Sequence, residues 1–365
     1  MLEYLEPIKY GIIIFPFIAL LITIPYILIH YHKYGSLPMI RVIIVYSFIL
    51  YLLIAYFLII MPLPSIEEVM NMTTPQTQLI PLMFIKDLID GIKEVGINEF
   101  YNAPAFYTIF FNICLTIPFG VYLKFYFNLN FKQVVLCGFL LSLFFELTQL
   151  SGLYGIYPRS YRLFDVDDLI INTLGSIIGY SIGIFVSYIM PNINEVNKEA
   201  FYKGQTISFF RRLTSFTVDY ILYSLFSGIM STMFIFIEHK YIKIICLIIY
   251  YIVIPYKNGQ TIANKFLNIK IISYQDEYLK LKNLVIRQLS FYIGVFILPK
   301  YIASTLMVIS SMIGYEFRII IMLFVMFAWF MYYLYIINQI KVKETLFYDK
   351  ISKTKIISTI NCKMD

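Results

Sequence analysis

The chain has 365 residues, of which 60% are hydrophobic and only 14% are charged. Soluble domains are usually about 45–50% apolar and about 25% charged, so the composition excludes an ordinary soluble protein and indicates a membrane protein. The formal net charge of +7 would also suit a nucleic-acid-binding protein. The basic residues instead follow the pattern of membrane loops, and the sequence has no nucleic-acid-binding motif. We therefore expect membrane lipids, and no nucleic acid, as partners.

Apolar runs of about 20 residues, the length of helix that crosses a hydrocarbon core, recur along the chain. They predict an all-α, polytopic transmembrane helical bundle of about nine spans in the cell membrane. The first run is too long for a signal peptide and lacks a small-residue cleavage site, so we expect it to be retained. The predicted spans are residues 10–29, 40–61, 105–127, 132–150, 168–190, 213–237, 241–256, 288–313 and 318–338.

The loops between the predicted spans differ in charge. Cytoplasmic loops carry an excess of Lys and Arg. The loops after the first and third spans, the segments 191–212 and 257–287, and the C-terminal tail are all basic. They fall on one side if the N-terminus is outside and the C-terminus is inside. The long loop 62–104, which is rich in acids, then lies outside.

The outer loop contains the segment FIKDLIDGIKEV (84–95). Its apolar residues recur at i, i+3, i+4 and i+7, with charges on the opposite side, which predicts a short amphipathic helix. This helix would lie either on the membrane surface or against the other spans.

One polar segment, PNINEVNKEAFYKGQ (191–205), divides the chain. We therefore predict a five-span membrane domain over 1–190, a cytoplasmic linker over 191–207, and a four-span membrane domain over 208–365 with a basic loop and tail.

Polar side chains gather near the outer ends of the third, fourth and fifth spans. Ionisable residues inside spans are rare and are candidates for function. Ser142, Glu146 and Gln149 share one face of the fourth span, and the loop after it would cap the group. Glu146 is expected to pair with Arg159 or Arg162, because an unpaired buried carboxylate is costly. The predicted ligand-binding cluster consists of Asn112, Ser142, Glu146, Gln149, Arg159, Arg162, Asp165, Asp167, Asp168 and Asn172.

A structural explanation stands beside the functional one for several of these residues. Hydrogen bonds between helices would account for Asn112, Gln149 and Asn172. Asp168 could cap the fifth helix. The stripe of Gly175, Gly179 and Gly183 would let helices approach closely.

Three segments of this region resemble the VanZ-like family. They are FFNICLTIPFG (110–120), SLFFELTQL (142–150) and FDVDDLIINTLGSIIGY (164–180). The named member of that family is linked to resistance to the glycopeptide antibiotic teicoplanin. The resemblance implies a protein of the cell envelope whose polar cluster faces the side where such antibiotics and cell-wall precursors meet.

The second half resembles the RDD family, which is named for one Arg and two Asp. Spacing places Arg212 and Asp219 on one helix face, and the family resemblance adds four motif positions in later segments. Ala263, Asn264 and Tyr348 depart from the family's usual Gly, Lys and His. The resemblance implies a transport role, with sodium/proton exchange by some members. The matching residues are Arg212, Asp219, Asp349, Gly259, Gln260 and Thr261.

Three functions follow as hypotheses. The first is binding of an amphiphilic ligand, a lipid-linked wall precursor or a lipoglycopeptide, at the outer-leaflet cluster, giving teicoplanin-type resistance. The second is a transporter or cation/proton exchanger in the second half, although no internal repeat supports it. The third is an enzyme acting on a lipid-linked substrate, which lacks a nucleophile beside the acids. The scattered Cys and His residues predict no metal site and no cofactor, and no catalytic residue is assigned.

Overall fold

The computed structural model describes residues 5–274, 278–313, 315–341 and 346–360. Within these residues, nine helices are long and apolar enough to cross a membrane, which confirms the predicted all-α bundle of about nine spans. The eighth span begins at Leu281, seven residues before the predicted 288. The spans are Glu6–Tyr34, Met39–Ile60, Pro104–Phe125, Phe131–Leu150, Val166–Ile189, Phe209–Met233, His239–Asn258, Leu281–Ile309 and Ile319–Gln339.

The chain forms two compact units. Unit 1 comprises Met1–Ile24 and Pro38–Val196, and unit 2 comprises Pro25–Leu37 and Asn197–Asp365. The first helix, α1 (Leu5–Tyr34), therefore contributes to both units. The predicted domain boundaries stay predictions, and the compact units differ from them chiefly in this segment.

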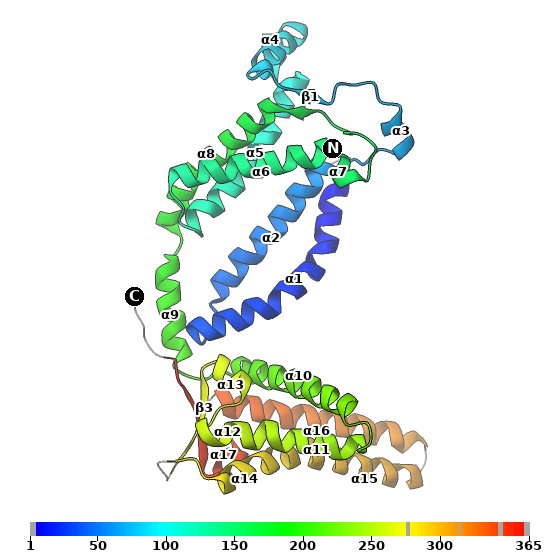
Figure 1. Cartoon of the computed structure of the whole chain (residues 1–365), viewed down its shortest axis with the longest axis vertical. Helices are drawn as coiled ribbons and strands as arrows, with labels where there is room; N and C mark the ends of the chain where they lie inside the picture. The colour runs from blue at the N-terminus through cyan, green and yellow to red at the C-terminus, as the bar shows by residue number, and fades with distance from the viewer. Residues whose placement is uncertain (1–4, 275–277, 314, 342–345, 361–365) are drawn as a thin grey trace. The chain divides into compact units, whose positions relative to one another are not determined.

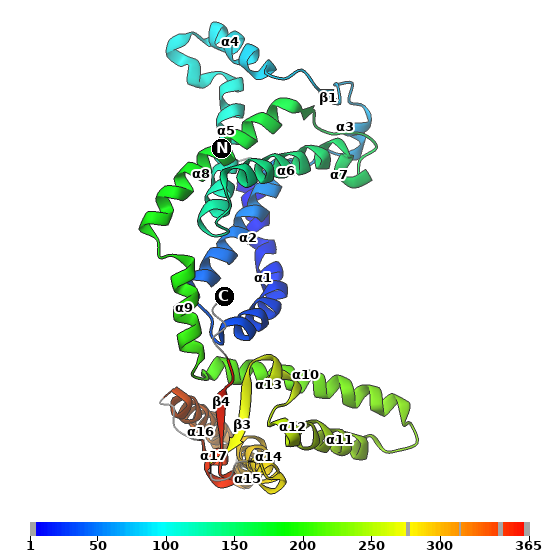
Figure 2. The same cartoon turned by 60° about the vertical axis from the view of Figure 1, so that its left-hand side comes forward.

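The central element of unit 1 is a group of three neighbouring helices, of which α5 and α8 lie side by side in Figures 1 and 2. A Cβ atom added at Gly179 would lie 2.1 Å from the carbonyl oxygen of Ile117. One added at Gly120 would lie 2.0 Å from the carbonyl oxygen of Ser176. Only glycine permits this backbone approach, as the sequence predicted. The three helices are α5 (Pro104–Phe125), α6 (Phe131–Leu150) and α8 (Val166–Ile189).

Apolar side chains join the helix α2 (Met39–Ile60) to α5 and α6. Phe119, Leu123 and Val134 form a buried cluster against which Phe48 and Leu52 of α2 pack. Lipid tails are as apolar as these side chains, so helices in a membrane associate through close packing of this kind. The cluster holds α2 beside the polar faces of the other helices.

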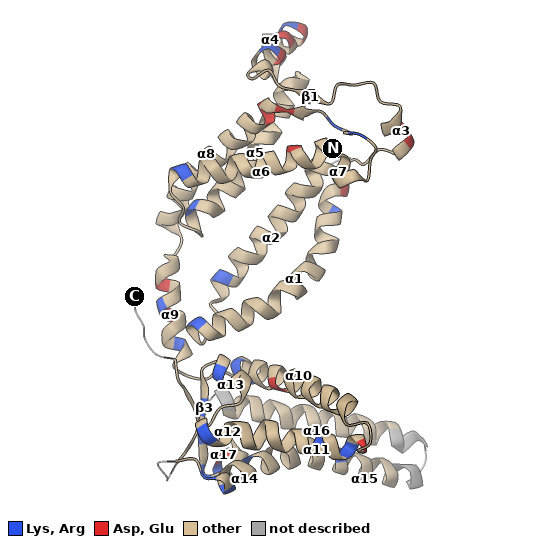
Figure 3. Cartoon of the chain, in the orientation of Figure 1, with Lys and Arg blue, Asp and Glu red and all other residues tan. Residues whose placement is uncertain are grey.

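The long loop between α2 and α5 is folded. Its helix α4 confirms the predicted helix over 84–95, and Figure 3 shows that α4 carries several charged residues of both signs. Strand β1 pairs in parallel with β2, which directly precedes α8. The elements are α3 (Ile66–Met70), β1 (Thr77–Gln78), α4 (Met83–Val95), η2 (Ile97–Asn102), α7 (Gly152–Gly155) and β2 (Phe164–Asp165).

Among its described residues, unit 2 has four long helical spans, two of which contain a π-helical turn. One of them runs through α11 (His239–Ile248), η3 (Ile249–Val253) and α12 (Ile254–Asn258). A π-helical turn shifts the face that a helix presents, and such turns are frequent at functional sites. The remaining helices are α9 (Ile193–Gly204), which continues from unit 1, α10 (Phe209–Met233), α13 (Ile262–Phe266), α14 (Leu281–Tyr292), η4 (Ile293–Ile297), α15 (Leu298–Ile313), α16 (Tyr315–Lys341) and α17 (Phe347–Ser352).

Unit 2 also contains a pair of antiparallel strands that the sequence analysis did not predict. Strand β3 (Ile269–Ser273) pairs along its whole length with β4 (Thr354–Ser358). The two segments read IKIIS and TKIIS and are rich in β-branched residues, and Ile271 faces Ile356 at the centre of the pair. Each strand has only five residues and lies in a basic region of the sequence. Its short apolar pattern could therefore not be distinguished from that of a loop.

The end of α1 is part of the core of unit 2. Tyr31 is buried against Leu267 and Ile269, which precede and begin strand β3. The side-chain amide of Asn268 donates to the carbonyl of His32 at 2.7 Å. These contacts attach the loop after α1, which is predicted to be cytoplasmic, to the strand pair of β3 and β4.

Candidate functional site

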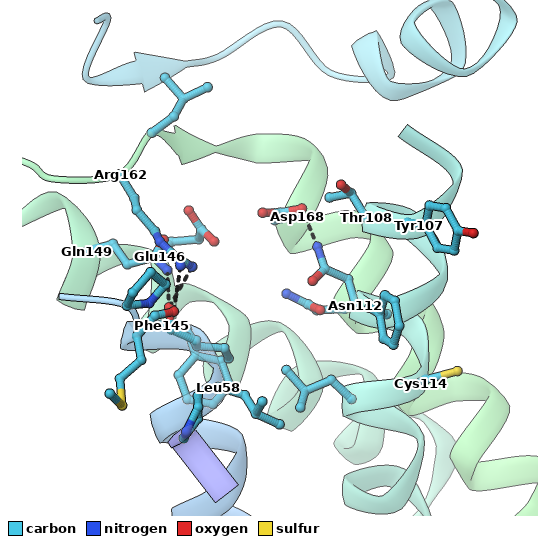
Figure 4. Close-up of a pocket in the computed structure, with 18 residues that line it drawn as sticks. Leu58, Tyr107, Thr108, Asn112, Cys114, Phe145, Glu146, Gln149, Arg162 and Asp168 are labelled. Atoms are coloured by element: carbon cyan, nitrogen blue, oxygen red, sulfur yellow. Dashed lines mark hydrogen bonds between the residues drawn. The ribbon is translucent and has the colours of Figure 1, made fainter. Parts of the chain in front are cut away.

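Unit 1 contains a cavity of about 740 Å³ between α2, α5, α6 and α8, which we call the unit 1 cavity. Figure 4 shows Glu146, Gln149 and Arg162 on one side of it and Asp168 with Asn112 on the other. The structure therefore brings together polar residues from separate spans, as the sequence analysis expected. Six of the ten predicted cluster residues line the cavity: Asn112, Glu146, Gln149, Arg162, Asp168 and Asn172.

The first wall centres on the carboxylate of Glu146, whose side chain is only 3% exposed. Its Oε2 accepts a hydrogen bond from the backbone N–H of Asp165 at 3.0 Å. The expected ion pair with an arginine is not formed among the described residues. Arg162 instead donates to the carbonyls of Ile59 and Met61 at 2.8 and 2.6 Å. The end of α2 leaves its last carbonyls without helical partners, and these take the guanidinium group.

The second wall is a hydrogen-bonded group from three helices. The side-chain amide of Asn112 donates to Oδ1 of Asp168 at 2.7 Å. The amide of Asn172 donates to the hydroxyl of Ser142 at 2.9 Å, and that hydroxyl donates to the carbonyl of Asp168 at 3.1 Å. Ser142 thus lies behind the lining and supports it. The carbonyl oxygen Oδ1 of Asn172 is buried and has no hydrogen-bond partner, although the side chain lines the cavity.

Asp165 and Asp167 do not line the unit 1 cavity, and each has a local structural partner. Asp167 is buried, and its two oxygens accept from the backbone N–H groups of Leu82 and Phe84 at 2.6 and 2.7 Å. It therefore caps the start of α4. Asp165 accepts from the backbone N–H of Asp167 at 2.8 Å and caps α8. Burial, together with the charges of Asp167 and Asp87, raises the pKa of Asp165.

Two further predicted residues have partners away from the cavity centre. Arg159 donates to the carbonyls of Met72 and Thr74 in the long loop between α2 and α5. Gln149 lines the cavity and donates to the carbonyl of Ile59 at 3.0 Å. The part of Arg159 in ligand binding stays a prediction, and its observed contacts are those of a loop anchor.

In unit 2, Asp219 is buried and accepts three hydrogen bonds. The donors are the hydroxyl of Tyr250 at 2.8 Å, the hydroxyl of Thr261 at 2.6 Å and the backbone N–H of Ala263 at 3.1 Å. Both carboxylate oxygens are therefore engaged by protein donors. The departure from the family's glycine at Ala263 keeps this contact, because the backbone supplies it.

The Gly-Gln-Thr segment is a turn that presents Thr261 to Asp219. Gly259 has φ +71°, and a Cβ atom there would lie 2.2 Å from the carbonyl oxygen of Ile271. The side chain of Gln260 donates to the carbonyl of Ile269 at 2.8 Å. Thr261 caps the short helix α13. Each motif residue thus has a structural task that its chemistry explains.

Asp349 lies in a separate buried ion pair. It pairs with Arg287, which also donates to the hydroxyl of Thr354 at 2.7 Å. Burial raises the pKa of the neighbouring Tyr348, whose ring lies against the Arg287 guanidinium. Arg212 and Asp219 line one cavity together with Arg287, and Asp349, the third residue of the family name, joins this group through its ion pair with Arg287. Arg287 was missed by the sequence analysis, and a single basic residue at the start of a predicted span gave little signal for it.

Arg211 is a second residue that the sequence analysis missed. Its side chain is 0% exposed. It donates to four backbone carbonyls and one hydroxyl at distances between 2.7 and 3.3 Å. The acceptors lie in segments far apart in the sequence: Gly35, Gly204, Leu267, Asn268 and Ser358.

The fold and these sites define a polytopic helical membrane protein with buried polar groups in each of its two units. The VanZ/LLP1 family model matches residues 48–188, and the RDD family model matches residues 206–353. The chain therefore combines a VanZ-like part with an RDD-like part in one multi-pass membrane protein of the cell envelope, as predicted. Comparisons with curated proteins and with solved structures gave no match. Among the described residues, no group of His, Cys, Asp and Glu could hold a metal ion.

Proposed function

We propose that the unit 1 cavity binds the polar head of an amphiphilic molecule of the cell envelope. The observation that carries the proposal is the set of acceptor oxygens on its two walls. Glu146 and Asp168 contribute carboxylates, and the buried Oδ1 of Asn172 has no protein partner. A buried acceptor without a partner costs about 1–3 kcal/mol, and a ligand donor would recover that cost.

The chemistry of the walls favours a ligand rich in hydroxyl or amine groups. The guanidinium of Arg162 already binds two backbone carbonyls, so acceptors outnumber free donors in the cavity. The remaining lining includes the apolar side chains of Leu58, Phe111 and Leu115. Small-molecule sites commonly have volumes of about 300–1,000 Å³, and 740 Å³ lies in that range. A sugar or amino group joined to an apolar body fits this combination.

A lipid-linked cell-wall precursor and a lipoglycopeptide antibiotic both have that chemistry. The match to the VanZ-like family, whose named member is linked to teicoplanin resistance, supports the lipoglycopeptide antibiotic as the ligand. We therefore propose that the protein lowers susceptibility to teicoplanin-type glycopeptides by acting at this cavity.

Expression in a teicoplanin-sensitive host tests the proposal. We expect the wild-type protein to raise the minimum inhibitory concentration of teicoplanin several-fold above that of the empty vector. Glu146→Gln keeps the shape of the side chain but removes its charge, so it should return the value toward that of the vector. Glu67→Gln, an exposed acid of the outer loop, is the matched control and should behave like the wild type.

Protein amounts in the membrane must be equal for the comparison, which immunoblotting of a tagged chain establishes. The proposal fails if the wild type gives the same value as the vector. The assignment of the site fails if Glu146→Gln protects as well as Glu67→Gln does.

Cation/proton exchange by the second half gains no comparable support. Asp219, the acid on which that hypothesis rests, has both oxygens engaged by Tyr250, Thr261 and Ala263. An exchanged ion would have to displace these donors.

A further inference from the structure

We propose that unit 2 contains a second ligand site, which binds an amphiphilic anion through Arg212. The site is a cavity of about 460 Å³ lined by residues of α10, α14, η4, α16 and α17, which we call the unit 2 cavity. Arg212 of α10 supplies the positive charge at this cavity.

The main observation is that Arg212, whose guanidinium contacts Tyr348, is incompletely hydrogen-bonded. Its Nε and Nη1 atoms are buried and have no hydrogen-bond partner. Among the described residues, no ion pair includes Arg212, and the other charged groups at the cavity are already engaged. Arg287 pairs with Asp349, and Asp219 accepts three hydrogen bonds. Two buried guanidinium nitrogens without a counter-charge are costly, so the site favours an anion.

The rest of the lining favours an apolar chain on that anion. Aromatic side chains from three spans contribute to the wall: Phe209, Phe216, Phe291, Tyr292, Phe296 and Tyr333. The two π-helical turns contribute here, since Tyr251 belongs to η3 and Val295 with Phe296 belongs to η4. A π-helical turn adds one residue and rotates the following side chains, which places these residues on the cavity.

The volume limits the size of the occupant. At about 460 Å³ the cavity lies in the lower half of the range of about 300–1,000 Å³ for small-molecule sites. One apolar chain with a carboxylate or phosphate head matches this space. A free fatty acid and one chain of an anionic membrane phospholipid share that chemistry. The two cavities therefore differ in preference, because unit 1 presents acceptors and unit 2 presents a cation for which the described residues supply no ion pair.

Binding of radiolabelled oleate to the full-length protein in phosphatidylcholine nanodiscs tests the proposal. We expect saturable binding by the wild type. Arg212→Gln should weaken binding by about tenfold or more, which corresponds to about 1.4 kcal/mol. Lys265→Gln removes an exposed basic charge of the same unit and is the matched control, with affinity unchanged. Phe296→Trp fills the cavity without changing charge and should also abolish binding.

Competition experiments distinguish the sources of the ligand. Displacement of oleate by phosphatidylglycerol in the nanodisc would identify the membrane phospholipid as the source, and no displacement would identify a free fatty acid. Oleyl alcohol lacks the charge and should compete weakly. The proposal is overturned if Arg212→Gln binds oleate as Lys265→Gln does, or if inorganic phosphate displaces oleate as well as unlabelled oleate does. If Arg212→Gln fails to fold, oleate binding by Arg212→Lys and by Phe296→Trp still tests the proposal.

Discussion

Two neighbouring arginines of α10 have opposite environments. Arg211 is fully buried and binds acceptors from four segments of unit 2, whereas two nitrogens of Arg212 have no partner. Consecutive residues of an α-helix point in directions about 100° apart, so one side chain faces the strand pair and the other faces the cavity. Arg211 is therefore structural, and Arg212 is available to a ligand.

The contrast predicts different effects of the same substitution. Arg211→Lys removes the planar fork that reaches several carbonyls at once, and losing two such charge-assisted bonds costs about 3 kcal/mol. We expect a clear decrease of the melting temperature in detergent, measured by intrinsic tyrosine fluorescence. Arg212→Lys keeps the charge and loses no observed bond of Nε or Nη1, so its melting temperature should stay close to the wild type. Equal losses for both variants would contradict the assignment of Arg211.

At the scale of elements, the contact between α5 and α8 sets the position of the second wall of the unit 1 cavity. Asn112 of α5 and Asp168 of α8 are joined by a 2.7 Å hydrogen bond. Gly175 and Gly179 of α8 lie against α5 with no room for a side chain. The glycines therefore serve the site indirectly, because they allow the two polar residues to meet.

Gly179→Ala should push the two helices apart. Overpacking of this kind costs about 1–3 kcal/mol, so we expect a lower melting temperature and a weaker teicoplanin phenotype. Gly228→Ala in α10 is the control, because a Cβ atom there meets nothing within 4 Å. Alanine also favours a helix by about 1 kcal/mol over glycine, so the control should be neutral or slightly stabilising. A destabilised control with a stable Gly179→Ala would refute the packing explanation.

At the scale of the whole molecule, the charge pattern predicts which loops lie on each side of the membrane. The nine spans fit an N-terminus outside and a C-terminus inside. The function proposed for the unit 1 cavity depends on this orientation, since that cavity must face envelope molecules. Figure 3 shows the long helices largely free of charge, as lipid contact requires.

Cysteine labelling measures the orientation. In a background without the native cysteines, Lys86→Cys in the outer loop should react with a membrane-impermeant maleimide in intact cells. Lys257→Cys should react only after the cells are permeabilised. The reverse pattern would place the unit 1 cavity on the cytoplasmic side and would remove the basis for the envelope ligand.

Three features could be predicted from the amino-acid sequence alone: the number of spans, the polar stripe of Ser142, Glu146 and Gln149, and the two family resemblances. Hydrocarbon is a uniform solvent that demands a long apolar helix wherever the chain crosses it, so local composition is sufficient to find the spans. Helical periodicity then places residues four apart on one face. Both kinds of information are local in the chain.

The partner of each buried polar group depends on how the helices pack. Asp167 caps α4 instead of lining the cavity, Arg162 binds the end of α2 instead of Glu146, and Arg287 pairs with Asp349. Each of these pairs joins residues that are more than 60 positions apart in the chain. A buried polar group takes whichever partner the packed helices bring within about 3 Å, and spacing within one helix carries no information about that choice.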